Sequence, residues 1–241
     1  MLDMGFGYQV DKIMKQVNKN RQMIMLSATI PAQIRKVSSK YLNNPVNISI
    51  ENNDVIETNI KQKIIKTIPN EKVDELINQI DQRKGSILIF VKTKIGVDKL
   101  VKKLKANSVK ASALHGGMRQ NKRSKIMQDF RDEKFRILIA TDIASRGLDV
   151  PHIEHIINYD MPQAPEDFIH RIGRTARAGS VGEAVSFLTQ KDTRIWRSIE
   201  RLLNKEESKK KRRDPKNENT PKFKHRKRSR SKNKKKVGGQ N

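Results

Sequence analysis

The sequence predicts an α/β fold built on a doubly wound parallel sheet, and two observations lead to this expectation. Short runs of Ile, Leu and Val recur from residue 59 onward, and segments with helical periodicity lie between them. Continuous apolar runs are typical of strands that are buried on both faces. Regular alternation of strand and helix favours parallel strands joined by helical crossovers. About 150 residues are enough for such a domain.

The elements can be placed in order along this region. Strands are expected at Gln62–Ile68, Ser86–Val91, Val109–Leu114, Arg136–Thr141, Ile153–Tyr159 and Glu183–Leu188. Helices are expected at Lys72–Asp81, Lys94–Ala106, Gln120–Arg131, Ala164–Ile172 and Lys191–Leu203. The domain is therefore expected to span residues 59–204.

The stretch before this domain has a less regular pattern. Residues 10–17 have helical spacing, and the apolar runs Gln22–Leu26 and Pro45–Ile50 predict two strands. Residues 51–58 are polar and acidic without periodicity, which is typical of a linker. A pair of strands without further neighbours is marginal in water. We therefore expect residues 1–50 to be loosely packed on their own.

Composition limits the class of protein. The 241 residues carry a formal net charge of +26, which points to a polyanionic partner, most plausibly nucleic acid. The absence of cysteine excludes disulfides and cysteine metal sites. The sequence has neither an apolar run of membrane-spanning length nor a signal peptide. A cytoplasmic protein without a membrane partner is expected.

The charge is concentrated at the C-terminus. Residues 205–241 contain 17 Lys and Arg against 4 Asp and Glu, which is half of the net charge. Phe223 and Val237 are almost their only large apolar side chains, so this stretch is predicted to be a disordered basic tail that binds RNA phosphates without sequence preference. A solubilising tail or a nuclear localisation signal would have a similar composition.

Polar residues and glycines follow several of the predicted strands. They are Lys92–Lys94, His115–Gly117 with Gln120 and Arg123 beyond, Thr141–Asp149, and Asp160. Each loop by itself is more typical of a turn or a helix cap. Because the carboxyl ends of parallel strands share one edge, where such sheets bind their ligands, we expect these loops to form one site.

The stretch from Tyr159 to Gly179 has the strongest signal. Arg171, Arg174 and Arg177 are three residues apart, a spacing that would bring them near one face of a helix. Guanidinium groups bind phosphate through paired N–H donors and keep their charge. A solvated basic helix face is the alternative interpretation.

These segments together resemble the DEAD-box RNA helicases. The matching segments are Ser27–Thr29, ILIFVKT (87–93), LHGGMRQNKR (114–123), ATDIASRGLDV (140–150) and HRIGRTAR (170–177), which look like motifs III, IV, IVa, V and VI. The resemblance covers residues 1–204 and is most similar to the bacterial RhlE-like branch. It implies that residues 59–204 form the second RecA-like domain, of the P-loop NTPase type, and that residues 1–50 are a remnant of the first.

The resemblance also implies roles for single residues at the nucleotide side. Arg174 and Arg177 match the arginine fingers that reach the γ-phosphate of ATP, and His170 and Arg171 match the positions that couple the nucleotide site to the opposing domain. Asp149, with Gly147 beside it, matches the position that meets the ribose.

Other matched positions belong to the RNA side. By resemblance, the groove for the RNA backbone is formed by Thr93, Gly116, Gly117, Thr141 and Arg146, with support from Gln120 and Arg123. Ser27 and Thr29 match the element that links ATP hydrolysis to strand separation. Backbone contacts agree with the sequence-independent binding inferred from charge.

The sequence departs from the family pattern in two ways. Ala176 replaces a glycine of motif VI, and we expect it to be tolerated because alanine is the better helix former. The 241 residues also contain no G-x-x-x-x-G-K-[ST] segment and no Asp-Glu-Ala-Asp tetrapeptide. The chain thus resembles a C-terminal piece that begins just after motif II. We expect it neither to bind ATP tightly nor to hydrolyse it alone, with Mg²⁺ and ATP bound only in a complete enzyme.

Two kinds of function remain open from the sequence. The first is the C-terminal part of an ATP-dependent RNA helicase that unwinds or remodels RNA duplexes. The second is a non-catalytic RNA-binding protein, or an inactive truncated product. A monomer that acts on RNA is expected, with a ribosomal or RNA-decay ribonucleoprotein as a further partner. Trp196 is expected to pack in the core, and His115, His152 and His155 are interpreted as loop or surface residues without a metal.

Overall fold

The computed structural model describes most of the predicted domain. The described residues are 6–26, 38–48, 59–145, 150, 152–176 and 180–213, and the side chains of 205–213 lie outside this description. The chain divides into two compact units, Met1–Leu202 and Leu203–Asn241. None of the described helices is long and apolar enough to cross a membrane.

The centre of the first unit is a six-stranded sheet, and each of its strand pairs is parallel. The strand order is β1-β6-β5-β2-β4-β3. The strands are β1 (Ile60–Lys66), β2 (Ile87–Phe90), β3 (Ser112–Leu114), β4 (Ile137–Ala140), β5 (His155–Asn158) and β6 (Gly182–Leu188). This architecture confirms the predicted fold class.

Helices connect these strands. They are α4 (Lys72–Asp81), α5 (Lys94–Ala106), α6 (Gln120–Arg131), the short α7 (Asp142–Ser145), α8 (Pro165–Ile172), the 3₁₀ turn η3 (Gln190–Asp192) and α9 (Thr193–Arg213). The bounds of α4, α5 and α6 are those predicted from periodicity. Helix α7 was not predicted, because four residues are too few to show a helical period.

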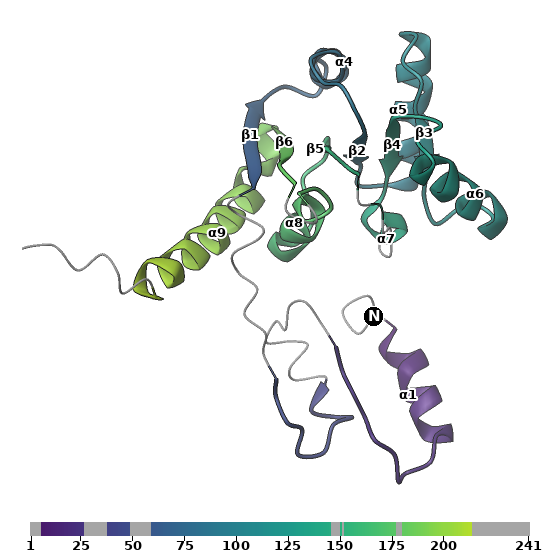
Figure 1. Cartoon of the computed structure of the whole chain (residues 1–241), viewed down its shortest axis with the longest axis vertical. Helices are drawn as coiled ribbons and strands as arrows, with labels where there is room; N and C mark the ends of the chain where they lie inside the picture. Colours follow the sequence, from purple (N-terminus) through teal and green to yellow (C-terminus); the bar gives the residue numbers. More distant parts are fainter. Residues whose placement is uncertain are drawn as a thin grey trace, which may run out of the picture. The chain divides into compact units, whose positions relative to one another are not determined.

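The apolar strands are covered on both faces. In the first core, Leu76 of α4 and Leu100 of α5 pack against alternate residues of the strands. These strand residues include Ile89, Ile139 and Phe187. The intervening residues Leu88, Phe90 and Leu138 are also buried and point to the opposite face. Figure 1 shows α4 and α5 on one side of the sheet and α8 on the other.

A partly buried ion pair lies at the amino edge of the sheet. The Arg83 guanidinium donates from Nε (2.9 Å) and Nη2 (2.6 Å) to the two carboxylate oxygens of Glu183, the second residue of β6. Burial alone would raise the pKa of Glu183, but the hydrogen bonds and charge of Arg83 outweigh it, so the pKa is lowered. Arg136 donates to the carbonyls of Ile80 and Arg83 at the end of α4, where a cation complements the helix dipole.

The histidines are less exposed than the sequence suggested. His155 lies in β5, with Nε2 2.8 Å from the carbonyl of Lys84. The Nε2 of His152 is 3.2 Å from the Phe130 carbonyl. His115 is only 9% exposed. His115 and His152 lie in loops, as interpreted, whereas the interpretation was wrong for His155, which is part of a strand.

The residues before the linker form one helix and little else that is regular. The helix α1 (Gly7–Gln16) has no buried residue. The described part of the two predicted strands is not strand, and Leu26 is 90% and Val46 86% exposed. An apolar run becomes a strand only when a neighbour pairs with it, and among the described residues neither run has one. Within this segment, the Asp11 carboxylate accepts hydrogen bonds from the Lys40 ammonium (2.7 Å) and the Tyr41 hydroxyl (2.8 Å).

The last helix is longer than predicted. Helix α9 continues to Arg213, past the expected end at Leu203. Residues 205–213 of the predicted tail thus belong to α9. Lys, Arg and Glu are good helix formers, and this segment contains no Gly or Pro that would end the helix. The rest of the predicted tail, 214–241, lies outside the described residues.

Candidate functional site

The loops predicted to form one site do meet at the carboxyl edge of the sheet. The Thr141 N–H after β4 donates to the carbonyl of Leu114 at the end of β3 (3.3 Å). The Asp160 N–H after β5 donates to the carbonyl of Phe90 at the end of β2 (3.1 Å). Because all strands are parallel, these loops lie side by side although they are distant in sequence.

From the last turn of α8, Arg171 joins the loops after β4 and β5 to the end of β2. Its side chain is 2% exposed, and Nε (2.6 Å) and Nη2 (2.8 Å) donate to the two oxygens of Asp142. Its Nη1 donates to the Asp160 carbonyl (2.6 Å) and to the Asn158 side chain (3.1 Å). The guanidinium also lies 4.9 Å from the centre of the Phe90 ring. A planar fork with five donors suits such a junction.

A second buried cation holds the loop that follows β5. Lys72, at the start of α4, donates to Asp160 Oδ1 (2.8 Å), and the Lys92 N–H donates to Asp160 Oδ2 (3.0 Å). The Lys72 ammonium lies 4.3 Å from the centre of the Tyr159 ring. Burial, with a smaller effect of the Asp160 charge, raises the pKa of Tyr159 to about 12. These contacts fix the chain just before α8.

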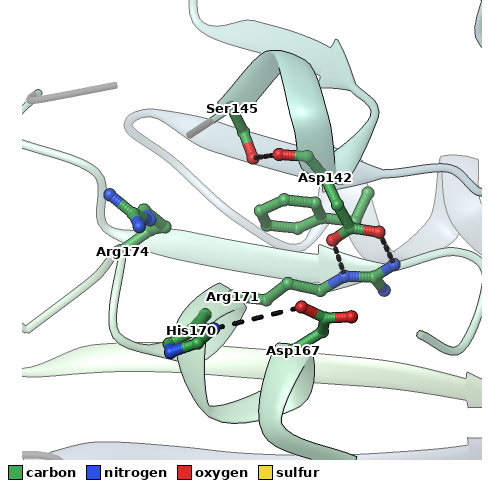
Figure 2. A pocket seen from close by; sticks show the side chains of 7 residues that line it. Asp142, Ser145, Asp167, His170, Arg171 and Arg174 are labelled. Atoms are coloured by element: carbon green, nitrogen blue, oxygen red, sulfur yellow. Dashed lines mark hydrogen bonds and ion pairs between the residues drawn. The ribbon is translucent and has the colours of Figure 1, made fainter. Parts of the chain in front are cut away.

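Arg174 is placed at the surface by this buried framework. It lines a small cavity of about 20 Å³ together with Asp142, Asp167, His170 and Arg171. Figure 2 shows that Arg171 reaches Asp142, while the Arg174 side chain points away from that pair. His170 Nδ1 lies 4.0 Å from Asp167 Oδ1, one helical turn away. Arg174 is half-buried.

The spacing of the arginines had suggested a shared helix face, but Arg171 and Arg174 do not share one. Helix α8 ends at Ile172, so Arg174 lies beyond it, and Arg171 is buried inside the domain. Ala176 has a positive φ of 56°. The argument that alanine is tolerated there as a helix former was wrong, since the residue is not helical and left-handed backbone favours glycine.

Several predicted site residues cannot be placed. The structure does not describe the predicted arginine finger Arg177, the predicted ribose and groove positions Arg146, Gly147 and Asp149, or the predicted coupling residues Ser27 and Thr29. Their roles remain predictions.

Two of the predicted RNA-side residues, Thr93 and Gly117, lie where α5 begins. The Thr93 hydroxyl caps α5 by accepting from the Gly96 N–H (3.0 Å). The Gly117 N–H donates to His115 Nδ1 (3.2 Å), which leaves the proton on Nε2 facing Asp98 Oδ1 (3.1 Å). A Cβ on Gly117 would lie 3.6 Å from Lys94 Cδ, so this loop abuts α5. Gly116 is exposed.

The Gln120 and Arg123 side chains are also brought together. Arg123 Nη1 donates to Gln120 Oε1 (3.2 Å) on the first turn of α6. The Nε of Arg123 is buried and has no hydrogen-bond partner among the described residues. The pair thus lies on the helix that follows the glycine loop, as the spacing predicted.

Sequence reasoning missed the residues that hold this edge together. Lys72, Asp98 and Asn158 have partners 88, 17 and 13 residues away, respectively. The sequence around these residues does not predict the contacts. Asp142 was interpreted as part of a loop typical of a helix cap. Among the described residues, no group of three or more His, Asp or Glu could hold a metal ion.

Comparison with known proteins identifies the family. Residues 70–179 match the helicase conserved C-terminal domain. ATP-dependent RNA helicase DBP2 of Meyerozyma guilliermondii is 36% identical over 84% of this chain and 38% of its own length. The C-terminal domain of the DEAD-box protein Dbp5 is 34% identical, with 87% of that chain covered and 61% of this one, at a TM-score of 0.56. The chain belongs to the DEAD-box RNA helicase family.

A second solved DEAD-box structure extends the match beyond the sheet domain. Dbp5 of S. cerevisiae, bound to RNA and ADP BeF3, is 32% identical and has a TM-score of 0.75, with 86% of this chain covered and 54% of that one. The chain spans about 40% of the length of the curated DEAD-box relatives that it matches. Its assignment to the RhlE-like branch remains a prediction.

Proposed function

We propose that this chain works as the second RecA-like half of an ATP-dependent RNA helicase. In the complete enzyme it would supply Arg174 and Arg177 to the γ-phosphate of ATP and one wall of the groove that grips the RNA backbone. The observation that supports this most directly is the Arg171 network. It ties the end of β2 and the loops after β4 and β5 to α8, which supports a role for Arg174 and Thr141 at one edge of the sheet.

The geometry suits contact with the outer phosphate of a nucleotide that another domain holds. The cavity beside Arg174 is about 20 Å³, which is far too small for a nucleotide. A half-buried guanidinium keeps its charge and presents paired donors, and an arginine delivered to the γ-phosphate stabilises charge in the transition state of phosphoryl transfer. ATP with Mg²⁺ would supply the phosphoryl group, and this chain would orient and neutralise it.

The RNA side suits contact with sugar and phosphate. Gly116 is exposed, and a Cβ there would meet no atom within 4 Å. The backbone at this position is therefore accessible from solvent. The Thr141 N–H donates to the carbonyl of Leu114 just before this loop, and Lys94, next to Thr93, lies beside Gly117. Backbone N–H and hydroxyl groups can donate to phosphate oxygens, which agrees with binding that does not depend on sequence. RNA is the proposed partner, and a ribosomal or RNA-decay ribonucleoprotein in the cytoplasm is the proposed setting for a monomer.

The chain by itself is proposed to be inactive as an ATPase. The 241 residues contain no G-x-x-x-x-G-K-[ST] segment and no Asp-Glu-Ala-Asp tetrapeptide. An arginine can stabilise charge only on a phosphate that other groups already hold. Measured alone, the chain should therefore show no RNA-stimulated ATP hydrolysis above buffer.

The test is to supply the missing half. The chain is fused to the nucleotide-binding domain of a DEAD-box relative, and RNA-stimulated ATP hydrolysis is measured. We expect activity, and we expect Arg174→Lys to reduce it by roughly 10³-fold or more, whereas the exposed control Arg131→Lys should leave it unchanged. RNA binding without any hydrolysis in the fusion would instead favour a non-catalytic RNA-binding protein.

A further inference from the structure

An open basic hollow lies outside the site described above, at the start of α9. It has a volume of about 570 Å³ and is lined by η3 and the first turns of α9. Four of its lining residues are cations, Lys191, Arg194, Arg197 and Arg201, and none is a carboxylate. All four are exposed.

The direction of these arginines is fixed by the packing of the helix. Ile199 is fully buried, and the Trp196 ring packs edge-on against Phe168 of α8 with their centres 6.0 Å apart. Trp196 and Ile199 therefore lie on the face of α9 that packs against the domain. Arg194, Arg197 and Arg201 follow one another at spacings of three and four, so they form one stripe on the other side of the helix.

The described carboxylates nearest in sequence to the stripe, Asp192 and the exposed Glu200, form no ion pair with it. Within the described part of the chain, no ion pair joins Arg194, Arg197 or Arg201 to a carboxylate. Asp192, close in sequence, is turned away, because its carboxylate accepts from the N–H (3.0 Å) and hydroxyl (2.5 Å) of Thr189. Like charges at these spacings repel each other, and an anion in the hollow would relieve that repulsion.

The shape of the stripe indicates what kind of anion fits. The three arginines are spread over about 10 Å along the axis, at 1.5 Å per residue. A line of guanidinium groups matches successive phosphates of a strand better than one compact anion. Guanidinium is also the side chain that binds phosphate through two donors. We propose that the Arg194–Arg197–Arg201 stripe is a second RNA-backbone site, which holds a segment of the same RNA that the groove engages.

This inference rests on the proposed RNA-binding function and locates a surface that the family motifs do not include. The site adds affinity for long or structured RNA without reading its sequence. It contributes about three phosphate contacts, so it should account for roughly two units in the slope of log affinity against log salt, at about 0.7 per contact for a single strand.

The experiment measures binding of the full chain to an RNA hairpin with a single-stranded extension, by fluorescence anisotropy at several salt concentrations. The variant R194Q/R197Q/R201Q should bind about tenfold more weakly at low salt, with the slope reduced by about two. The control K103Q/K105Q/K110Q removes the same charge from the end of α5 and the loop after it, at the opposite edge of the sheet. It should retain the wild-type slope.

Two further readouts keep the outcomes distinct. R194K/R197K/R201K preserves the charge and should retain most of the affinity, while circular dichroism checks that all variants remain folded. If the wild type binds RNA, and R194Q/R197Q/R201Q loses no more affinity than the control K103Q/K105Q/K110Q, the stripe is only general basic surface and the inference is overturned. If the wild type binds no RNA, the proposed function itself fails.

Discussion

Replacing Arg171 with methionine separates two roles that this arginine could have. In the structure its guanidinium makes four hydrogen bonds to Asp142, Asn158 and Asp160 and is 2% exposed. Removing one partner of a buried ion pair costs about 3–5 kcal/mol. Because the Asp142 side chain is 29% exposed, water can solvate it in part, so we expect a loss near the lower end, about 3 kcal/mol. For a chain of this size that corresponds to a fall in Tm of roughly 6–12 °C.

The assay is urea unfolding followed by the fluorescence of Trp196, the only tryptophan in the chain. Its ring contacts Phe168 of α8, so it reports on the helix that Arg171 anchors. The exposed control Arg131→Met should change stability by less than about 0.5 kcal/mol. Combining Arg171→Met with Asp142→Leu should recover at least about 1 kcal/mol, because no charge is then left unpaired.

One result would refute this reasoning about Arg171. If Arg171→Met unfolds at the same urea concentration as the control, and the double variant shows no coupling, the arginine does not anchor the edge. A loss of ATP hydrolysis in the fused enzyme at unchanged stability would then mean that Arg171 contacts the nucleotide directly.

Three further predictions concern the stability of the domain. Ala176→Gly should stabilise it by roughly 0.5 kcal/mol in urea unfolding, because relief of left-handed strain slightly exceeds the entropy that glycine adds to the unfolded chain; destabilisation would show that the methyl group packs more favourably than assumed. Gly182→Ala should destabilise it by about 2 kcal/mol or more, since its Cβ would lie 2.3 Å from Thr175 Oγ1 and 2.9 Å from the Ala176 backbone nitrogen, and unchanged Tm would contradict this. The lowered pKa of Glu183 means that its pair with Arg83 contributes above the ordinary carboxyl pKa of 4.5 and is lost as pH falls below it; the stability difference between wild type and Glu183→Gln should therefore shrink from pH 6 to pH 3, and a constant difference would exclude this linkage.

Periodicity predicted the sheet well and the site only in part. The central strands β2 (ILIF) and β4 (ILIA) are continuous apolar runs, and burial on both faces leaves a signal that local sequence shows directly. The loops at the carboxyl edge could likewise be assigned from their positions after strands. The Arg171 network could not, because Asp142, Asn158 and Asp160 become its partners only when β2, β4 and β5 are adjacent, and strand order is not written in any local pattern.

The arginines show why a motif does not give its own geometry. The three-residue spacing of Arg171 and Arg174 suggested that their side chains would lie on the same helix face. Helix α8 ends between them, and Arg171 is buried whereas Arg174 is half-buried. The prediction of a strand at Gln22–Leu26 was wrong because a local pattern does not show whether a partner strand is present. This run is apolar enough to form a strand, but among the described residues it has no strand beside it.

The pairing of β1 with β6 has a consequence for how the protein is made. Ile60 lies opposite Gly182, so β1 waits for a partner that is translated more than a hundred residues later. At about 5–20 residues per second, the wait on the ribosome is roughly 6–24 s. During that time β1 is an unpaired edge strand, and Lys61, Lys63 and Lys66 place charges along it that discourage pairing with other nascent chains. Replacing these lysines with threonine should therefore lower the soluble yield while leaving the folded domain stable.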